Sequence, residues 1–129
     1  MSNLHRLLSL TLVAALLFTG CNSAWFRRAA RVAGEEAAYV ALEGYLTKAG
    51  VKSSDHFVDA VRMVVQNRDY AGAAAAFAVA LAEHNSRAAE KLTSAQVVSL
   101  LRRAQPVVNK ASPRVATSIG NFCDYLAVR

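Results

Sequence analysis

Few side chains in this chain have the types and spacing that acid–base or nucleophilic catalysis needs. His56 lies three residues before Asp59, so the two can share one face of a helix, but no nucleophile accompanies them. His84 closes an apolar stretch beside Glu83, a setting that favours a hydrogen-bonded histidine of the core or rim over a ligand. A Ser–His–Asp arrangement assembled across the fold stays open as an alternative. The sequence predicts no enzyme and no catalytic residue.

Metal and cofactor sites are not indicated either. Beyond residue 21 the chain holds two histidines and one cysteine, Cys123, too few for a ligand set with zinc-like spacing. It has no glycine-rich phosphate loop and no Gly-x-Ser-x-Gly turn. We therefore expect no metal and no cofactor. Cys123 has apolar neighbours, so we interpret it as a small buried side chain.

The beginning of the chain carries the clearest chemical signal. Arg6 precedes Leu7–Phe18, a run of uncharged and mostly aliphatic residues. The length of this run suits the apolar region of a secretory signal peptide and falls short of the ~20 residues of a membrane-spanning helix. Thr19 and Gly20 then supply the small side chains that signal peptidases require before the cleavage site.

The segment Phe18-Thr19-Gly20-Cys21 resembles a lipobox, the processing signal of bacterial lipoproteins. This resemblance implies cleavage of residues 1–20, linkage of a diacylglycerol to Cys21 and acylation of its new amine. Phe18 stands where the class usually has leucine. Asn22, in place of aspartate, resembles the outer-membrane default of enterobacterial lipoproteins. We expect a lipid-anchored envelope protein, at the outer membrane facing the periplasm rather than at the inner membrane.

Two other interpretations of this region stay open. Residues 7–26 form an uncharged stretch long enough for an uncleaved membrane anchor, and the positive-inside rule would then place the domain in the cytoplasm. Cys21 could also be an ordinary core cysteine. The sequence Thr-Gly-Cys-Asn-Ser is a poor centre for a membrane helix, which favours the lipoprotein interpretation.

Residues 21–31 are predicted to follow the lipid anchor as a juxtamembrane segment. The predicted membrane-contact residues are Trp25, Phe26, Arg27, Arg28 and Arg31. Aromatic rings lie at headgroup level and guanidinium groups bind lipid phosphates, so this composition is typical of an interfacial segment. As an alternative, Trp25 and Phe26 are the first core residues of the helix that begins here.

The net charge of the chain, +6 at pH 7, is unevenly distributed. Residues 21–90 hold equal numbers of acidic and basic side chains, whereas residues 91–129 hold six basic residues against Asp124 alone. This excess attracts anionic partners, such as an acidic envelope protein or glycan. The predicted partner-binding residues are Arg102, Arg103, Lys110 and Arg114. The alternatives are a merely solvated face and a nucleic-acid interface, and the latter requires residence in the cytoplasm.

Apolar periodicity and cap signals predict an all-α fold, a compact bundle of four to five helices over residues 32–129. The expected helices cover residues 24–49, about 14 residues from Ser53 or Ser54, residues 70–90, residues 94–105 and residues 113–126. The expected caps are Ser53 or Ser54, Asp69, the box Thr93-Ser94-Ala95-Gln96, and Ser112-Pro113. Pro106 is expected to end or kink the fourth helix.

The uncharged stretch of residues 70–82 is expected to form the centre of the bundle. Its small stripe should let a neighbouring helix approach closely: Ala71, Ala75, Ala78 and Ala82. Larger residues there would then overpack the core by ~1–3 kcal/mol each. The first helix has no polar side between residues 37 and 42, which predicts burial on most sides. Glu43 is expected to reach the rim or to pair with a nearby arginine.

These observations favour binding over catalysis: a small lipoprotein that serves as a protein-interaction module in the bacterial envelope. Pilotins, small helical outer-membrane lipoproteins that escort secretion channels, are similar in size and architecture, an analogy of fold without a shared motif. The alternatives are an immunity or exclusion lipoprotein that blocks a toxin, a phage or a conjugation partner, and a small envelope hydrolase. Without export, a nucleic-acid-binding helical domain remains.

Overall fold

The computed structural model describes residues 24–128, apart from the side chains of Ala24 and Phe26. This part of the chain is helical and contains no strand. Its helices are α2 (Ala24–Lys48), α3 (Ser54–Asn67), α4 (Tyr70–Arg87), α5 (Ser94–Asn109) and α6 (Pro113–Ala127). The predicted all-α fold is confirmed.

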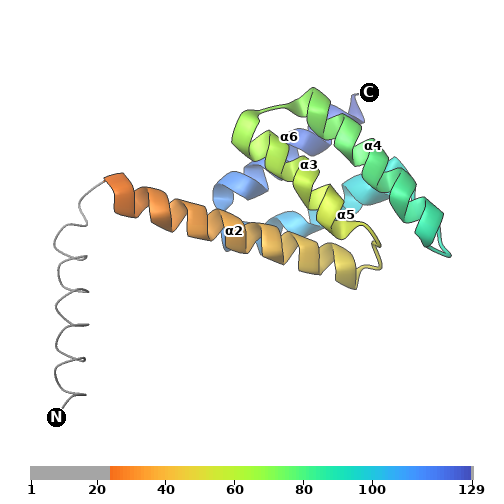
Figure 1. The fold of residues 1–129 in the computed structure, drawn as a ribbon, viewed down its shortest axis with the longest axis horizontal. Coiled ribbons are helices and arrows are strands. Elements are labelled where there is room, and N and C mark those ends of the chain that lie inside the picture. The colour runs from red at the N-terminus through yellow and green to blue at the C-terminus, as the bar shows by residue number, and fades with distance from the viewer. Residues whose placement is uncertain (1–23, 129) are drawn as a thin grey trace, which may run out of the picture. The chain divides into compact units, whose positions relative to one another are not determined.

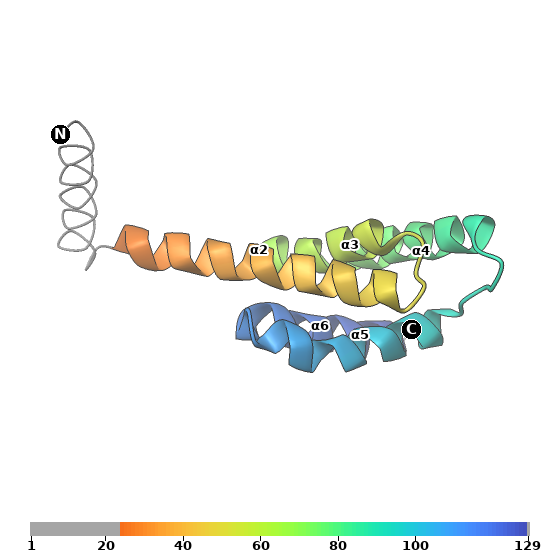
Figure 2. The same cartoon turned by 90° about the horizontal axis from the view of Figure 1, so that it is seen from below.

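The described residues divide into two units, residues 24–33 and residues 34–128. In the second unit α3 and α4 form one antiparallel hairpin, and α5 and α6 form another (Figure 1). The part of α2 from residue 34 lies along both hairpins, as Figure 2 shows from below. α3 also packs on α6, which joins the two hairpins into one bundle.

Three of the predicted helix starts carry the expected side-chain caps. Asp69 caps α4, Thr93 and Gln96 form the reciprocal capping box of α5, and Ser112 caps α6 ahead of Pro113. Each cap supplies an acceptor for a backbone N–H that the first turn of a helix leaves free. The boundaries of these helices therefore follow from local chemistry.

Ser53 departs from its predicted role as a cap. It directly precedes α3, but its side chain makes no capping hydrogen bond. Instead its Oγ donates to the carbonyl oxygen of Ala80 at 2.6 Å and ties the start of α3 to α4. Ser54 Oγ shares a 2.7 Å hydrogen bond with Thr47 Oγ1, which links α3 to the end of α2.

The fourth helix is longer than predicted. Pro106 was expected to end or kink it near Gln105, and the first alternative is wrong because α5 continues through Pro106 to Asn109. Pro106 is exposed, and water can bind the carbonyl that loses its helical donor. Arg68 is exposed and ends α3 in a left-handed backbone conformation with φ of 52°.

The core is aromatic at its centre. The Phe77 ring forms T-shaped contacts with Phe57 at 5.2 Å and with Phe122 at 6.0 Å between centroids, so three helices meet at one side chain. Aliphatic residues surround this cluster, and α2 adds the buried side chains of residues 38, 39, 42 and 46. Ala73 and Ala80 are fully buried, and their small size lets neighbouring helices come close to α4.

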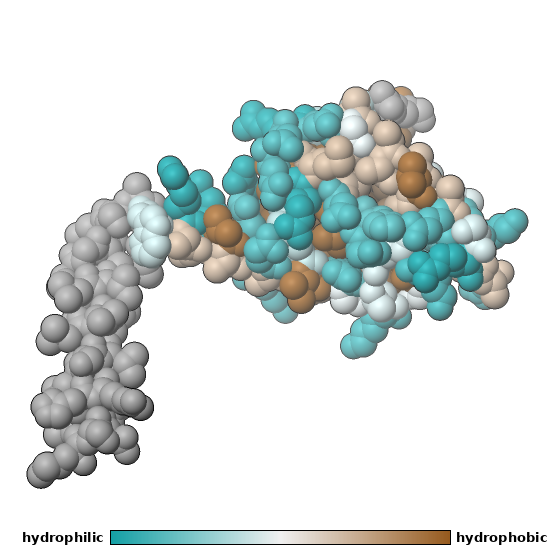
Figure 3. Space-filling view, in the orientation of Figure 1, coloured by the Kyte–Doolittle hydropathy of each residue, from teal (hydrophilic) through white to brown (hydrophobic). Residues whose placement is uncertain are grey.

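Fewer side chains of α4 are buried than the sequence predicts. Its buried side chains are Ala73, Phe77, Ala80 and His84. The predicted alanine stripe is exposed instead: Ala71, Ala75, Ala78 and Ala82. Val79 is also 67% exposed, and the surface along the first part of α4 is pale brown in Figure 3. The expectation that this stripe receives a helix is wrong, because alanine is tolerated on both sides of a helix and does not mark the inner one.

The second half of α2 also buries one side only. Val40 is 70% exposed, and Ala37 and Gly44 are exposed as well, so the expected burial on most sides is wrong. Glu43 is exposed at the rim, as predicted. The carboxylate that is buried is Glu35, with 8% exposure.

Candidate functional site

Residues 24–33 contain the described part of the predicted membrane-contact segment. Trp25 is 64% exposed. The three predicted arginines are exposed too: Arg27, Arg28 and Arg31. Successive residues of a helix are about 100° apart, so Trp25, Ala29 and Val32 share one side and the arginines lie together on the adjacent side. This segment of α2 is therefore amphipathic.

Such an arrangement suits the surface of a bilayer, where aromatic rings and arginines lie at headgroup level. Trp25 is not among the buried core residues. Cys21 and the Phe26 side chain lie outside the described residues. Among the helices that the structure describes, none has both the length and the apolar content to span a membrane.

The four predicted partner-binding cations fall into two pairs with different surroundings. Arg102 Nη2 lies 2.8 Å from Asp124 Oδ1. Arg114 Nη1 lies 2.8 Å from Glu35 Oε1, and its Nη2 donates to the carbonyl oxygen of Val65 at 3.1 Å. Arg114 thus joins α2, α3 and α6. Both arginines are compensated inside the domain.

Arg103 and Lys110 form the second pair. Both are exposed, and within residues 24–128 neither makes an ion pair or a side-chain hydrogen bond. Arg103 lies four residues before Val107 on the same face of α5, and Lys110, the residue that caps the end of α5, lies three residues after Val107 and continues that face. The structure therefore leaves two of the four predicted cations available to a partner.

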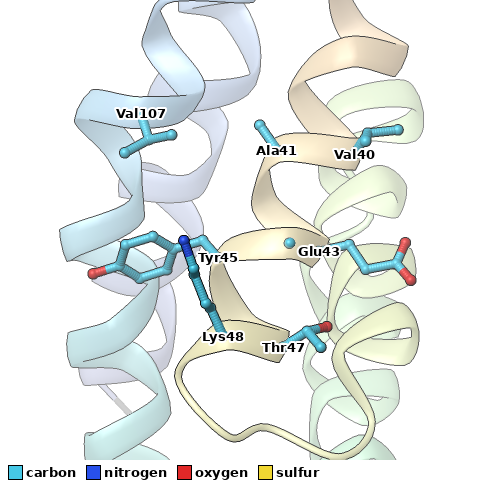
Figure 4. Close-up of a pocket in the computed structure, with 8 residues that line it drawn as sticks. Val40, Ala41, Glu43, Tyr45, Thr47, Lys48 and Val107 are labelled. Atoms are coloured by element: carbon cyan, nitrogen blue, oxygen red, sulfur yellow. The ribbon is translucent and has the colours of Figure 1, made fainter.

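An apolar groove of about 810 Å³ lies between α2 and α5, next to this face. Its lining residues are Val40, Ala41, Glu43, Gly44, Tyr45, Thr47, Lys48 and Val107. In Figure 4, Val107 faces Ala41 across the groove, and the Tyr45 ring lies over α5. Lys48 extends toward α5, whereas Glu43 points away from it (Figure 4). The groove is thus apolar in its middle and basic toward α5.

Sequence reasoning missed this groove, although two signals point to it. Gly44 is an isolated glycine inside a strongly predicted helix, a pattern that often has a packing or functional reason. Val107 is an aliphatic residue between two cations on one face of α5, and it is 41% exposed. Neither signal shows by itself that α2 and α5 lie side by side, which depends on the tertiary fold.

His56 contacts a different carboxylate from the one that its spacing suggests. Its Nδ1 is hydrogen-bonded to Glu83 Oε2 of α4, and its Nε2 lies 3.6 Å from Asp55 Oδ2. The hydrogen bond to Glu83 and the negative charge of Asp55 raise the pKa of His56 above its ordinary value of 6.5, with a smaller effect from Asp59. The contact links α3 and α4 at the surface.

His84 is a structural side chain, as the sequence favours. It is buried, its Nδ1 accepts from the backbone N–H of Lys52 at 2.9 Å, and its Nε2 donates to the carbonyl oxygen of Glu90 at 3.2 Å. An imidazole that accepts at one nitrogen and donates at the other is the neutral tautomer. The two ring nitrogens therefore hold the loop before α3 and the loop after α4.

Cys123 and Tyr39 are the other buried titratable side chains to consider. Cys123 is buried, as predicted, and this burial raises the pKa of its thiol to about 11. Burial also raises the pKa of Tyr39 to about 12, and the Arg62 guanidinium lies 4.2 Å from its ring centroid. In the described part of the chain, no cluster of histidine, cysteine and carboxylate side chains could hold a metal ion.

Two surfaces combine exposed apolar side chains with cations that make no ion pair among the described residues: Trp25 with its arginines, and the groove flanked by Arg103 and Lys110. Comparison with known protein families, with curated proteins and with solved structures finds no match for this chain. The function proposed below therefore depends on the chemistry of these two surfaces.

Proposed function

We propose that the protein is a lipid-anchored interaction module of the bacterial envelope, which binds an anionic protein partner through its helical domain. The observation that carries this proposal is the position of Arg103 and Lys110, exposed and without ion pairs among the described residues, beside an apolar groove. Cations at the edge of an apolar surface give both attraction and orientation to an acidic partner. Arg102 and Arg114 contribute less, because Asp124 and Glu35 compensate them.

The membrane part of the proposal depends on two signals that act together. One acyl chain gives only marginal membrane binding, which further chains or basic residues stabilise. Acylated Cys21 supplies the first signal in the lipoprotein interpretation. Three arginines in the first turns of α2 supply the second, at about 1 kcal/mol each near an anionic surface. A tethered domain of this kind suits a pilotin-like role, in which it recruits or escorts another envelope protein.

Crosslinking in cells, followed by affinity capture of the lipidated protein, tests the binding surface. Replacement of Arg103 and Lys110 by Gln is expected to reduce capture of the crosslinked partner by roughly tenfold or more, because charge-assisted contacts are lost. The matched control replaces Lys52 and Lys91 by Gln, which removes the same charge from two other exposed positions. Equal loss in both variants, or loss in neither, contradicts the proposed surface.

Intact-mass measurement on the protein purified from membranes tests the anchor. The expected mass begins at Cys21 and includes a diacylglycerol and an N-linked acyl chain. Cys21→Ala is expected to remain unprocessed and to lose this modification. A mass that begins at Met1, or a free thiol on Cys21 in the parent protein, would overturn the lipid-anchor proposal.

A further inference from the structure

We propose that the groove between α2 and α5 binds an amphipathic helix whose apolar side is flanked by acidic residues. This helix would be the binding element of the anionic partner, so the inference rests on the proposed function for the partner's existence. The chemistry of the groove depends only on residues 34–128. Three properties of the groove support this occupant: an open glycine, exposed aliphatic edges and a basic side.

Gly44 is the first property. Glycine in a helix interior is less stable than alanine, so its presence there calls for a reason. A Cβ at Gly34 would lie 3.0 Å from Ala111 O, and one at Gly120 would lie 2.7 Å from Gln105 Nε2, so both glycines admit neighbours inside the domain. A Cβ at Gly44 would meet no atom within 4 Å. The bare backbone at Gly44 is open to the outside, where it allows a second helix to approach closely.

The aliphatic edges are the second property. Val40 on α2 and Val107 on α5 are among the few large apolar side chains that the described residues expose. Ala41 and Tyr45 lie between them in the lining. A helix with apolar side chains every three or four residues presents them as a row, and a hydrophobic groove between two helices receives such a row.

The basic side is the third property, and it selects the charge of the occupant. Lys48 extends toward α5 (Figure 4), and Arg103 and Lys110 flank Val107 on the same face of α5. Glu43 points away from this side (Figure 4). Acidic residues along the bound helix would meet these cations. A second copy of this chain, groove against groove, would instead bring like charges together, which disfavours that occupant.

Methyl NMR of the full chain in nanodiscs of zwitterionic lipid, titrated with two synthetic helical peptides, tests the proposal. Both peptides carry leucine at the a and d positions of three heptads, and they differ only in flanking Glu or flanking Lys. Zwitterionic lipid gives neither peptide an electrostatic preference for the bilayer. We expect the Glu peptide to shift the methyl resonances of Val40, Ala41 and Val107, and to bind roughly tenfold more tightly than the Lys peptide.

A matched pair of variants localises the binding. Gly44→Leu fills the groove and is expected to weaken binding of the Glu peptide by about tenfold or more. Ala78→Leu places the same side chain on the exposed side of α4 and should leave the affinity unchanged.

Equal affinity for the two peptides, absence of shifts, or shifts confined to other methyl groups would each overturn the proposal. The same holds for concentration-dependent shifts of the groove methyl groups without peptide, which would show that a second copy covers the groove. None of these results depends on which anchor holds the chain in the nanodisc or on capture of a partner in cells. Failure here is therefore distinguishable from failure of the proposed function.

Discussion

The contact between α3 and α4 differs from the groove between α2 and α5 in how many of its residues have partners within the domain. At the α3–α4 contact, Ser53 Oγ donates to Ala80 O at 2.6 Å, and the backbone N–H of Lys52 donates to His84 Nδ1 at 2.9 Å. Buried polar groups need such partners, because an unpaired one is costly. Folding alone accounts for the residue types at this contact.

The groove between α2 and α5 follows another pattern. Val40 remains exposed, Gly44 meets nothing within the domain, and Arg103 and Lys110 have no ion pair among the described residues. Exposed Val40 and Gly44 add little to the stability of the domain, because one side chain stays in solvent and the other residue is a weak helix former. Folding therefore explains the α3–α4 contact but not the groove, which agrees with the binding role proposed above.

Truncation of His84 gives the largest expected effect and tests the folding side of this comparison. His84→Ala leaves the Lys52 N–H without its acceptor and opens a cavity, so the free energy of unfolding should fall by about 2–4 kcal/mol. Urea unfolding followed by far-UV circular dichroism measures the change, provided that the transition is two-state.

The matched variant on the groove side is Val107→Ala. Because Val107 is half-exposed and alanine favours a helix, the expected change lies within about 0.5 kcal/mol. If Val107→Ala lowered the free energy of unfolding as much as His84→Ala does, the two regions would not differ, since the groove would then be part of the structural core.

Helix boundaries could be predicted from the sequence because local chemistry sets them. Asp69, the Thr93–Gln96 box and Ser112 act through backbone groups a few residues away, and no tertiary information is needed. The inner sides of α2 and α4 could not be predicted in the same way. Both helices are rich in alanine, which carries almost no signal for either side, so tertiary packing decides which alanines are buried.

The candidate site was predicted in part for a similar reason. The excess of basic residues is a property of the sequence, but compensation depends on the fold: Arg114 meets Glu35, which lies far away along the chain. The groove itself requires α2 and α5 to lie side by side, and only the fold supplies that neighbourhood. Short-range patterns therefore identified the cations but not which of them remain unpaired.

Two glycines of α2 test the comparison at single residues, with a smaller expected change in the free energy of unfolding. Gly44→Ala is expected to raise the free energy of unfolding by about 0.5–1 kcal/mol, because alanine stabilises a helix and the new Cβ meets nothing. Gly34→Ala should give no such gain, since its Cβ would lie 3.0 Å from Ala111 O, a backbone atom that cannot easily move. Paired urea unfolding curves of the two variants measure the difference. A gain at Gly34 with a loss at Gly44 would mean that the domain itself uses the bare backbone of the groove.

The smallest expected effect concerns His56, at the exposed edge of the α3–α4 contact. Its pKa is raised, chiefly by the hydrogen bond to Glu83, so the folded state binds its proton more tightly than the unfolded chain does. The contribution of this contact to stability is therefore full below the ordinary pKa of 6.5 and is lost as pH rises through the raised pKa. An NMR titration should give a His56 pKa above 6.5, which Glu83→Gln lowers and Asp59→Asn lowers less. If Asp59→Asn lowered the pKa of His56 more than Glu83→Gln does, the main partner of His56 would lie within α3. The exposed edge of the α3–α4 contact would then be less completely paired than its buried centre.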